Sequence, residues 1–169
     1  MKIYITGLGV ISAIGNNVEE NYNSLQGEKT GIEKIKFLPF DSAVLTGEVK
    51  LSNETLIAKM NLKNGFYSRT SLLGIAAAKE CWKKNSLNQN IRTGIISATS
   101  VGGMDKTEKY YRQVLQKKTS DISLILTHDS GTTTEKIAEQ LGINGYINTN
   151  KKIFISINYN MIIFIINSF

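Results

Sequence analysis

Three stretches of this chain carry side chains whose types could do chemistry: a single thiol, a His-Asp-Ser run and a glycine-rich loop. Cys81 is the only cysteine, so a nucleophilic thiol is conceivable, whereas an intrachain disulfide is not. The residue falls near the end of a stretch with helical periodicity. We therefore expect Cys81 to be an ordinary small side chain, buried or half-buried, and not a reactive one.

The run His128-Asp129-Ser130 contains the three side-chain types of a hydrolase triad. Triad members are brought together by the fold, so three consecutive residues cannot be assumed to converge in that geometry. We predict a loop at this position. His128 is also the only histidine, and one His with one Cys falls short of the usual structural zinc ligand set, so no metal site is predicted.

The loop Gly7-Leu8-Gly9 follows a short alternating stretch and suggests a dinucleotide-binding fingerprint. That fingerprint needs a third small residue that opens a helix directly, and an acid at the end of the next strand. Ser12 does not open a helix, because the next helical pattern starts near Val18, and no second strand with a terminal acid comes after it. The glycines therefore predict close backbone packing and a tight turn. A nucleotide-binding α/β domain stays open as an alternative that rests on this loop alone.

Strand and helix patterns alternate around these stretches. Short strands are predicted at four places: 3–6, 45–49, 94–99 and from 146 onward. Helices are predicted over four ranges: 18–25, 68–84, 105–118 and 132–141. Residues 28–45 have the composition of a loop. The alternation predicts an α/β fold with parallel strand pairing.

Local signals mark the ends of two of these helices. Asn17 with Glu20, and Thr132 with Glu135, have the spacing of a capping box, and Gly142 is a predicted helix stop. The best-defined helix lies between them, over residues 68–84. Its predicted apolar stripe consists of Leu72, Ile75, Ala78 and Trp82.

Composition and charge fit one globular domain, with 41% apolar and 20% charged residues. The net charge of +6 can favour acidic partners. No run of Lys or Arg exceeds two residues, so we predict solvated surface charge and no nucleic-acid binding. The N-terminal stretch lacks the apolar region and cleavage site of a signal peptide, and a single cysteine suits a reducing compartment. Both features predict the cytoplasm.

Residues 150–169 differ in composition from residues 1–149. Seven of these twenty residues are Ile, four are Asn, and none is Gly or an acid. Seventeen are Asn, Lys, Ile, Phe or Tyr, which codons made only of A and T can encode. Three interpretations are open: a genuine β-rich terminus, a membrane-seeking segment shorter than the roughly 20 apolar residues of a span, or out-of-frame translation of an AT-rich gene. We place the domain boundary between 149 and 150.

Five blocks of residues 1–149 succeed one another in a specific order and spacing. They are Ile5-Thr6-Gly7-Leu8-Gly9-Val10-Ile11-Ser12 with Ile14-Gly15-Asn16; Ser24-Leu25 with Thr30-Gly31-Ile32; Ser71 with Ala76-Ala77-Ala78-Lys79-Glu80; Gly94-Ile95-Ile96-Ser97-Ala98-Thr99 with Val101-Gly102-Gly103; and Ile137-Ala138, Leu141-Gly142 and Gly145-Tyr146-Ile147-Asn148-Thr149. Together they closely resemble the N-terminal part of the beta-ketoacyl-[acyl carrier protein] synthases, the condensing enzymes of the thiolase-like superfamily. The match covers well under half of a full family member.

The resemblance implies a thiolase-like fold, in which two similar α/β halves stack into a layered core. This chain would form an incomplete N-terminal half, with a mixed sheet and packed helices. Family members are acyltransferases of fatty-acid and polyketide synthesis that need no cofactor. Their Cys nucleophile, at the start of a buried helix, takes an acyl group from an acyl carrier protein. A helix N-terminus favours the thiolate. Two His residues then assist decarboxylation of a malonyl unit, since they can donate hydrogen bonds to the developing enolate.

The chain departs from the family pattern where the nucleophile is expected. The family strand that resembles residues 146–149 runs shortly into a Thr-Ala-Cys motif, whereas this chain continues with Asn150-Lys151-Lys152. Cys81 lies far from that position in the sequence, and His128 matches neither family His. The sequence therefore predicts no catalytic, cofactor-binding or metal residue in this chain.

Three functions remain as hypotheses. The first is the N-terminal part of a beta-ketoacyl synthase that is inactive by itself and ends before its nucleophile. The second is a non-catalytic half-fold that binds an acyl carrier protein, a companion synthase chain or a second copy of itself. The third is the unrelated nucleotide-binding domain. No membrane span is predicted for any of them.

Overall fold

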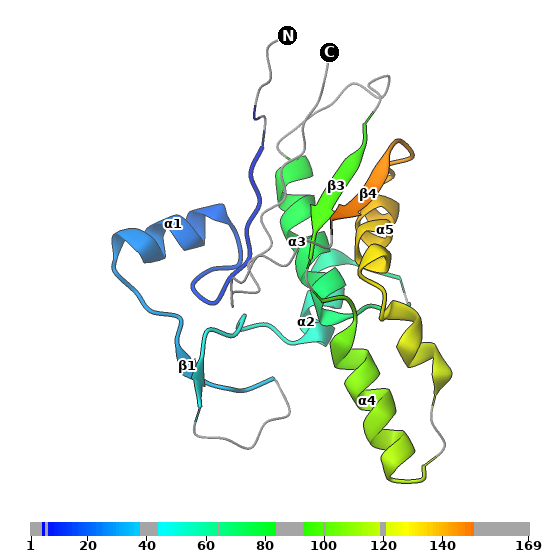
Figure 1. Cartoon of the computed structure of the whole chain (residues 1–169). Helices are drawn as coiled ribbons and strands as arrows, with labels where there is room; N and C mark the ends of the chain where they lie inside the picture. Colours follow the sequence, from blue (N-terminus) through cyan, green and yellow to red (C-terminus); the bar gives the residue numbers. More distant parts are fainter. Residues whose placement is uncertain are drawn as a thin grey trace.

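The computed structural model describes residues 5, 7–37, 44–63, 65–83, 93–99, 101–118 and 121–150. In Figure 1, helix α1 and a small hairpin stand on one side, and the remaining helices gather beside the strands β3 and β4 on the other. The strand predicted at 3–6 lies mostly outside the described residues, and the tail from 151 onward lies wholly outside them. No helix in the described ranges combines the length and the apolar character needed to cross a bilayer.

Helix α1 spans Val18–Gln26 and begins where the capping signal predicted. The side chain of Asn17 accepts a hydrogen bond from the backbone N–H of Glu20 at 2.8 Å. The Glu20 carboxylate accepts in turn from the N–H of Asn16, one residue earlier than in a standard capping box. These bonds satisfy N–H groups that the first turn would leave unpaired.

Helix α3, Arg69–Lys83, forms the centre of the core. The predicted stripe is confirmed, since Leu72, Ile75 and Ala78 are almost fully buried and Trp82 packs against the core at its edge. Full burial of each aliphatic side chain contributes about 1.5–3 kcal/mol to folding. Helix α5, Ser130–Leu141, and helix α2, Asn53–Met60, pack on either side of α3.

The start of α5 differs from its prediction, and its end agrees. Asp129 is the N-cap, and its carboxylate accepts from the N–H of Gly131. Thr132 therefore lies inside the first turn, and the capping box predicted at Thr132 and Glu135 is wrong. Asp129 and Thr132 both have side chains that can cap a helix, and in the structure Asp129 is the cap. Gly142 ends the helix in the left-handed region, with φ 68°, as predicted.

Strands β3, Ile95–Ala98, and β4, Ile147–Asn150, pair in parallel, which confirms the predicted pairing. Ile95 lies opposite Ile147. The residues at 94–99 have the composition of a buried strand, yet only alternate side chains of β3 are buried. Ile95 is buried, whereas Ile96 is 58% exposed. The reason is that α5 covers one face of the strand pair, so alternate side chains point away from it.

A second, antiparallel pair joins β1, Glu33–Lys34, to β2, Leu45–Thr46. The two pairs are separate two-stranded sheets, one parallel and one antiparallel. The range 28–45 is therefore not wholly loop. Helix α2 was not predicted, although Ser52 caps it by accepting from the N–H of Thr55.

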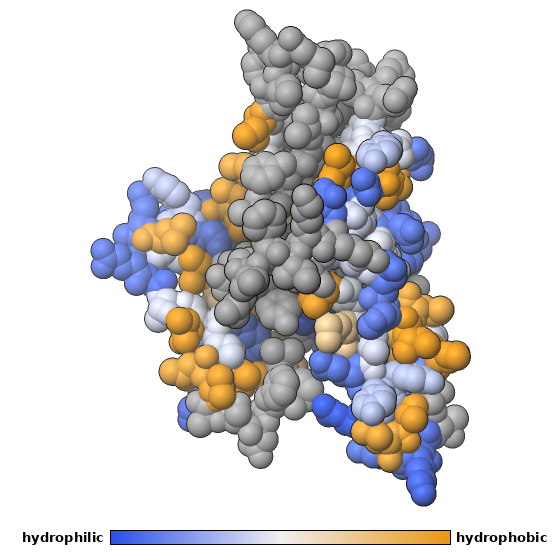
Figure 2. All heavy atoms as spheres, viewed as in Figure 1, coloured by the Kyte–Doolittle hydropathy of each residue, from blue (hydrophilic) through white to orange (hydrophobic). Residues whose placement is uncertain are grey.

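Helix α4, Met104–Leu115, and the 3-10 helix η1, Ile122–Thr127, contact each other beyond the core. The helix predicted at 105–118 is confirmed, and it lies at the surface, since α4 has no buried residue. The 3-10 helix η1 was not predicted. Four large apolar side chains of the pair are strongly exposed: Tyr111, Leu115, Ile122 and Leu126. In Figure 2, hydrophobic side chains gather at the lower right, where Figure 1 places α4 and η1.

Candidate functional site

The carboxyl ends of β3 and β4 form the candidate site, because parallel strands end at the same edge of a sheet. Thr134 of α5 fixes both strands. Its hydroxyl lies within hydrogen-bond distance of the hydroxyls of Ser97 on β3 and Thr149 on β4. Thr134 itself is fully buried. One side chain therefore sets the register of the helix against both strands.

A second group of buried hydroxyls joins α5 to α3. Ser68 and Ser71 lie 2.9 Å apart, and the Ser71 hydroxyl donates to Thr133 at 3.4 Å. Buried hydroxyls cost free energy unless they are paired, so these contacts make the close approach of the two helices possible. Sequence reasoning missed these residues. The available signal was the run of threonines at 132–134 inside a helical pattern, because Thr is unfavourable in a helix interior unless its side chain has a partner.

The loop after β3 is held against η1. The N–H of Gly103 donates to the carbonyl of Thr127 at 2.6 Å. A Cβ atom at Gly103 would lie 2.2 Å from the Thr127 side-chain oxygen, so only glycine fits. Because Gly103 is also the N-cap of α4, this contact places the start of that helix beside the loop that leaves the strand pair.

Cys81 is 1% exposed and lies inside α3, two residues before its end. The prediction of a small buried side chain is confirmed. The position lacks the features that activate a thiol, since it is not at a helix N-terminus and has no access to solvent. Cys81 is therefore not a candidate nucleophile at the end of β4.

The His128-Asp129-Ser130 run does not form a triad. His128 is exposed and its Nδ1 lies 3.0 Å from the hydroxyl of Thr107 on α4, while Asp129 caps α5. The Ser130 hydroxyl is buried without a hydrogen-bond partner in the described structure. The predicted loop is only a two-residue link, because η1 ends at Thr127 and α5 begins at Ser130.

The glycine-rich loop packs on α3, as its composition predicted. A Cβ atom at Gly9 would lie 1.9 Å from the carbonyl oxygen of Ala77, so the loop backbone touches the helix backbone. The N–H of Val10 donates to the carboxylate of Glu80 at 3.0 Å. A phosphate group could not accept from the N–H of Val10, because the carboxylate of Glu80 already does so. The geometry therefore removes support from the nucleotide-binding alternative.

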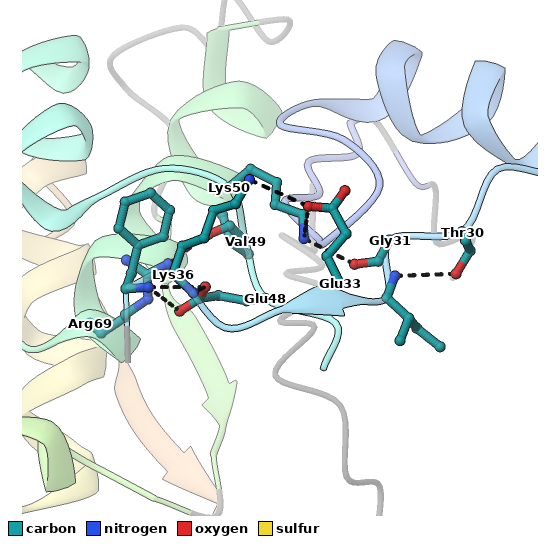
Figure 3. A network of polar contacts seen from close by, with 10 residues as sticks. Thr30, Gly31, Glu33, Lys36, Glu48, Val49, Lys50 and Arg69 are labelled. Atoms are coloured by element: carbon teal, nitrogen blue, oxygen red, sulfur yellow. Dashed lines mark hydrogen bonds and ion pairs between the residues drawn. The ribbon is translucent and has the colours of Figure 1, made fainter. Parts of the chain in front are cut away.

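Arg69, at the start of α3, lies at one end of the polar network in Figure 3. Its guanidinium donates to the carbonyls of Val49 and Leu51 and to the side chain of Asn53, at 2.8–2.9 Å. Burial lowers the pKa of Arg69, and the nearby carboxylate of Glu48 opposes that shift. The group stays charged at neutral pH, because the usual pKa of Arg is above 12. Arg69 therefore fastens the segment before α2 to the core.

The other members of the network in Figure 3 differ in exposure: Glu48 is buried, whereas the side chain of Glu33 is 50% exposed. Lys50 lies 3.3 Å from Glu33 and donates to the carbonyl of Gly31. The ammonium of Lys50 lowers the pKa of Glu33. Such exposed pairs contribute little to stability. Among the described residues, no three side chains of metal-binding type come together.

Comparison with known proteins identifies relatives of one kind. No protein-family model matches the chain. Over 125 residues, 69% of its length, it is 33% identical to 3-oxoacyl-[acyl-carrier-protein] synthase 2 of Staphylococcus aureus (strain MRSA252), of which it spans 30%. It superposes on the ishigamide ketosynthase/chain length factor with a TM-score of 0.75 and 21% identity, covering 87% of this chain and 39% of that one.

A further similar structure, AntDE:AntF, is a type II PKS acyl-carrier protein in complex with its ketosynthase. The superposition has a TM-score of 0.62 and 18% identity, and it covers 88% of this chain and 37% of that one. At these identities the solved structures establish the fold, and the sequence relative supplies the family. The chain therefore belongs to the beta-ketoacyl synthases of the thiolase-like fold, of which it represents a part.

Proposed function

We propose that this chain is the N-terminal portion of an acyl-carrier-dependent condensing enzyme, and that it builds the scaffold of the reaction without catalysing it alone. In that reaction an acyl group on a Cys thiol is attacked by the carbanion that decarboxylation of a malonyl thioester leaves. A carbon–carbon bond forms, the acyl C–S bond breaks, and carbon dioxide departs. The position of the strand ends carries the proposal, because Thr134 holds β3 and β4 side by side where the family nucleophile is expected.

The proposal of inactivity rests on where the reactive side chains lie. Cys81 is buried inside α3, away from a helix N-terminus, so it has neither a thiolate-favouring position nor room for a thioester. His128 is exposed and bonded to Thr107, so it does not point into a pocket with the thiol. Condensation needs a thiolate with hydrogen-bond donors beside it. The described side chains do not supply that arrangement.

The test is a condensation assay on the purified chain, with acyl-loaded and malonyl-loaded carrier protein and product detection by mass spectrometry. We expect no β-ketoacyl product. The matched control is Cys81→Ala, which removes the chain's only thiol. Product that forms with the wild-type chain and disappears in Cys81→Ala would refute the proposal. Product that persists in both identifies a contaminating host enzyme, and the assay is then repeated with protein made by cell-free synthesis.

A second candidate function is docking to a companion synthase chain, to a second copy, or to an acyl carrier protein. The observation that favours it is the exposed apolar surface over α4 and η1, formed by Tyr111, Leu115, Ile122 and Leu126. Soluble monomers rarely expose contiguous apolar patches of more than a few hundred Å², and larger ones mark interaction sites. Two of the similar solved structures contain a chain length factor or an acyl-carrier protein beside the ketosynthase.

Mass photometry and light scattering on wild-type, Leu115→Glu and Leu25→Glu proteins test the docking. Leu25 on α1 is as exposed as Leu115, so it controls for a general effect of charge. We expect the wild-type protein to associate with itself or with a partner chain. Leu115→Glu should abolish this association, and Leu25→Glu should preserve it. This candidate function would be refuted if the protein were monomeric at every concentration and bound neither an acyl carrier protein nor a ketosynthase chain.

For residues 150–169 we propose a separate, Ile-rich tail that is encoded out of frame, although Asn150 is still the last residue of strand β4. Its composition supports this, because it differs from that of the preceding residues. A DNA read across codon 149 and several hundred bases beyond it tests the proposal. Another frame that resumes with a Thr-Ala-Cys motif would support it, and the absence of such a frame would refute it. We place the protein in the cytoplasm, because its single cysteine fits a reducing compartment.

A further inference from the structure

In the part of the chain that the structure describes, helix α1 is attached to the core through polar contacts. Asn21 is its only buried residue. Its large apolar side chains point away from the core, with Tyr22 58% and Leu25 68% exposed. Most helices of globular proteins are held by an apolar face, so α1 lacks the usual source of helix stability. Figure 1 shows α1 standing apart from the helices around β3 and β4.

The segment 12–26, here called the α1 lobe, is bonded internally. The Ser24 hydroxyl donates to the carbonyl of Ile14 at 2.7 Å, and the Asn21 amide donates to the carbonyl of Asn17 at 2.8 Å. Ser12 and Asn21 share a further short side-chain contact. These contacts tie the turn at 12–17 to the helix. The α1 lobe can therefore move as one piece.

One carboxylate fastens this lobe to α3. Glu80 accepts from the N–H of Val18 at 2.8 Å through one oxygen, and from the N–H of Val10 at 3.0 Å through the other. Val10 and Val18 lie on either side of Ile11 in the sequence, and Ile11 is buried in the core. The side chain of Glu80 thus bridges the fixed loop and the first turn of α1. A carboxylate at a helix N-terminus is also favoured by the helix dipole.

Residues of the α1 lobe, of α2 and of α3 line one pocket together. The pocket has a volume of about 570 Å³, and Asn16, Asn17 and Glu20 of the lobe line it. Leu56 of α2 and Trp82 of α3 line the opposite wall. Such a gap gives the lobe little apolar contact to lose when it moves away. Elements with few buried apolar contacts open at low free-energy cost.

We propose that the α1 lobe is a hinged flap, anchored at Ile11 and latched to α3 by Glu80, that opens while the core of α3 and α5 stays folded. Opening breaks the bond from Val18 to Glu80 and widens the pocket in front of Trp82. The flap is a property of the fold and does not depend on condensing activity.

Native-state hydrogen exchange on the full chain tests the flap. In the wild-type protein we expect the amides of residues 21–26 to exchange at least 100-fold faster than those of residues 133–138, with little dependence on urea. Glu80→Gln keeps the shape of the side chain and replaces one acceptor with a donor. It should speed exchange in α1 at least tenfold and leave α5 unchanged. Glu108→Gln, at an exposed position on α4, is the matched control and should change neither.

Two results would overturn the proposal. One is equal protection of α1 and α5 in the wild-type protein with the same urea dependence, because both helices would then open only by global unfolding. The other is equal acceleration of both helices in Glu80→Gln, because Glu80 would then stabilise the whole fold. Should Glu80→Gln fail to fold, the wild-type measurement decides by itself.

Discussion

Replacing Arg69 should cost more stability than replacing any exposed arginine of the described chain. Arg69→Met keeps an unbranched side chain and removes the guanidinium, which donates three hydrogen bonds to Val49, Leu51 and Asn53. Bonds from charged groups contribute about 1.5–3 kcal/mol each when they are fully buried. The guanidinium is only partly buried, so water replaces some of this, and we expect a loss of about 2–4 kcal/mol. For a chain of this size that lowers Tm by about 5–15 °C.

Urea unfolding followed by the fluorescence of Trp82, the only tryptophan, measures this loss. Arg112→Met on the exposed surface of α4 is the matched control and should change stability by less than about 0.5 kcal/mol. Arg69→Lys should fall between the two, because an ammonium keeps the charge and cannot make the forked contact. If Arg69→Met were no more destabilising than Arg112→Met, the central role assigned to the guanidinium would be refuted.

Four further changes test other parts of the structure. Gly9→Ala should reduce the melting temperature strongly or prevent folding, because its Cβ would lie 1.9 Å from the carbonyl oxygen of Ala77; an unchanged circular-dichroism melt would contradict the packing. Thr134→Val should cost about 1–3 kcal/mol in urea titrations, since two hydroxyl partners on β3 and β4 lose their contact, and a neutral result would show that the hydroxyls are dispensable. Hydrogen bonds from the N-terminal turn lower the pKa of Glu20 below its usual value, so its contribution to stability is present above the unfolded pKa and is lost as the pH falls through the folded pKa. Acid titration of unfolding should therefore differ between wild-type and Glu20→Gln at neutral pH and converge at low pH. Cys81 should resist iodoacetamide in the folded protein and react in urea, as read by intact mass, and rapid labelling of the native chain would refute its burial.

Features encoded by neighbouring residues were predictable from the sequence. Asn17 begins α1 through a hydrogen bond to its side chain, and Gly142 ends α5 because glycine adopts the left-handed conformation. Both predictions are confirmed. The stripe on α3 is likewise a local pattern, because helical spacing alone places Leu72 and Ile75 on one face. The buried environment of Cys81 is explained by the same periodicity.

Predictions from the sequence were wrong where two neighbouring residues could both cap a helix, and where the burial of a side chain depends on which element of the fold packs against it. Thr132 and Asp129 can both cap a helix, and only the packed position of α5 selects Asp129. Ile96 has the composition of a buried strand residue, yet it is exposed because the described helices cover the other face of β3. Tyr22 and Leu25 have helical spacing without an apolar surface to receive them.

The sequence by itself determined the family, the α/β alternation and the glycine that ends α5, because these depend on residue identity and short-range geometry. Only the tertiary structure decided how the pieces meet. Thr134 contacts two strands from distant parts of the chain, and Glu80 joins two amides that lie 62 and 70 residues away from it. Such contacts leave no local pattern, since a hydroxyl or carboxylate takes its role from whichever donor or acceptor the fold brings within about 3 Å.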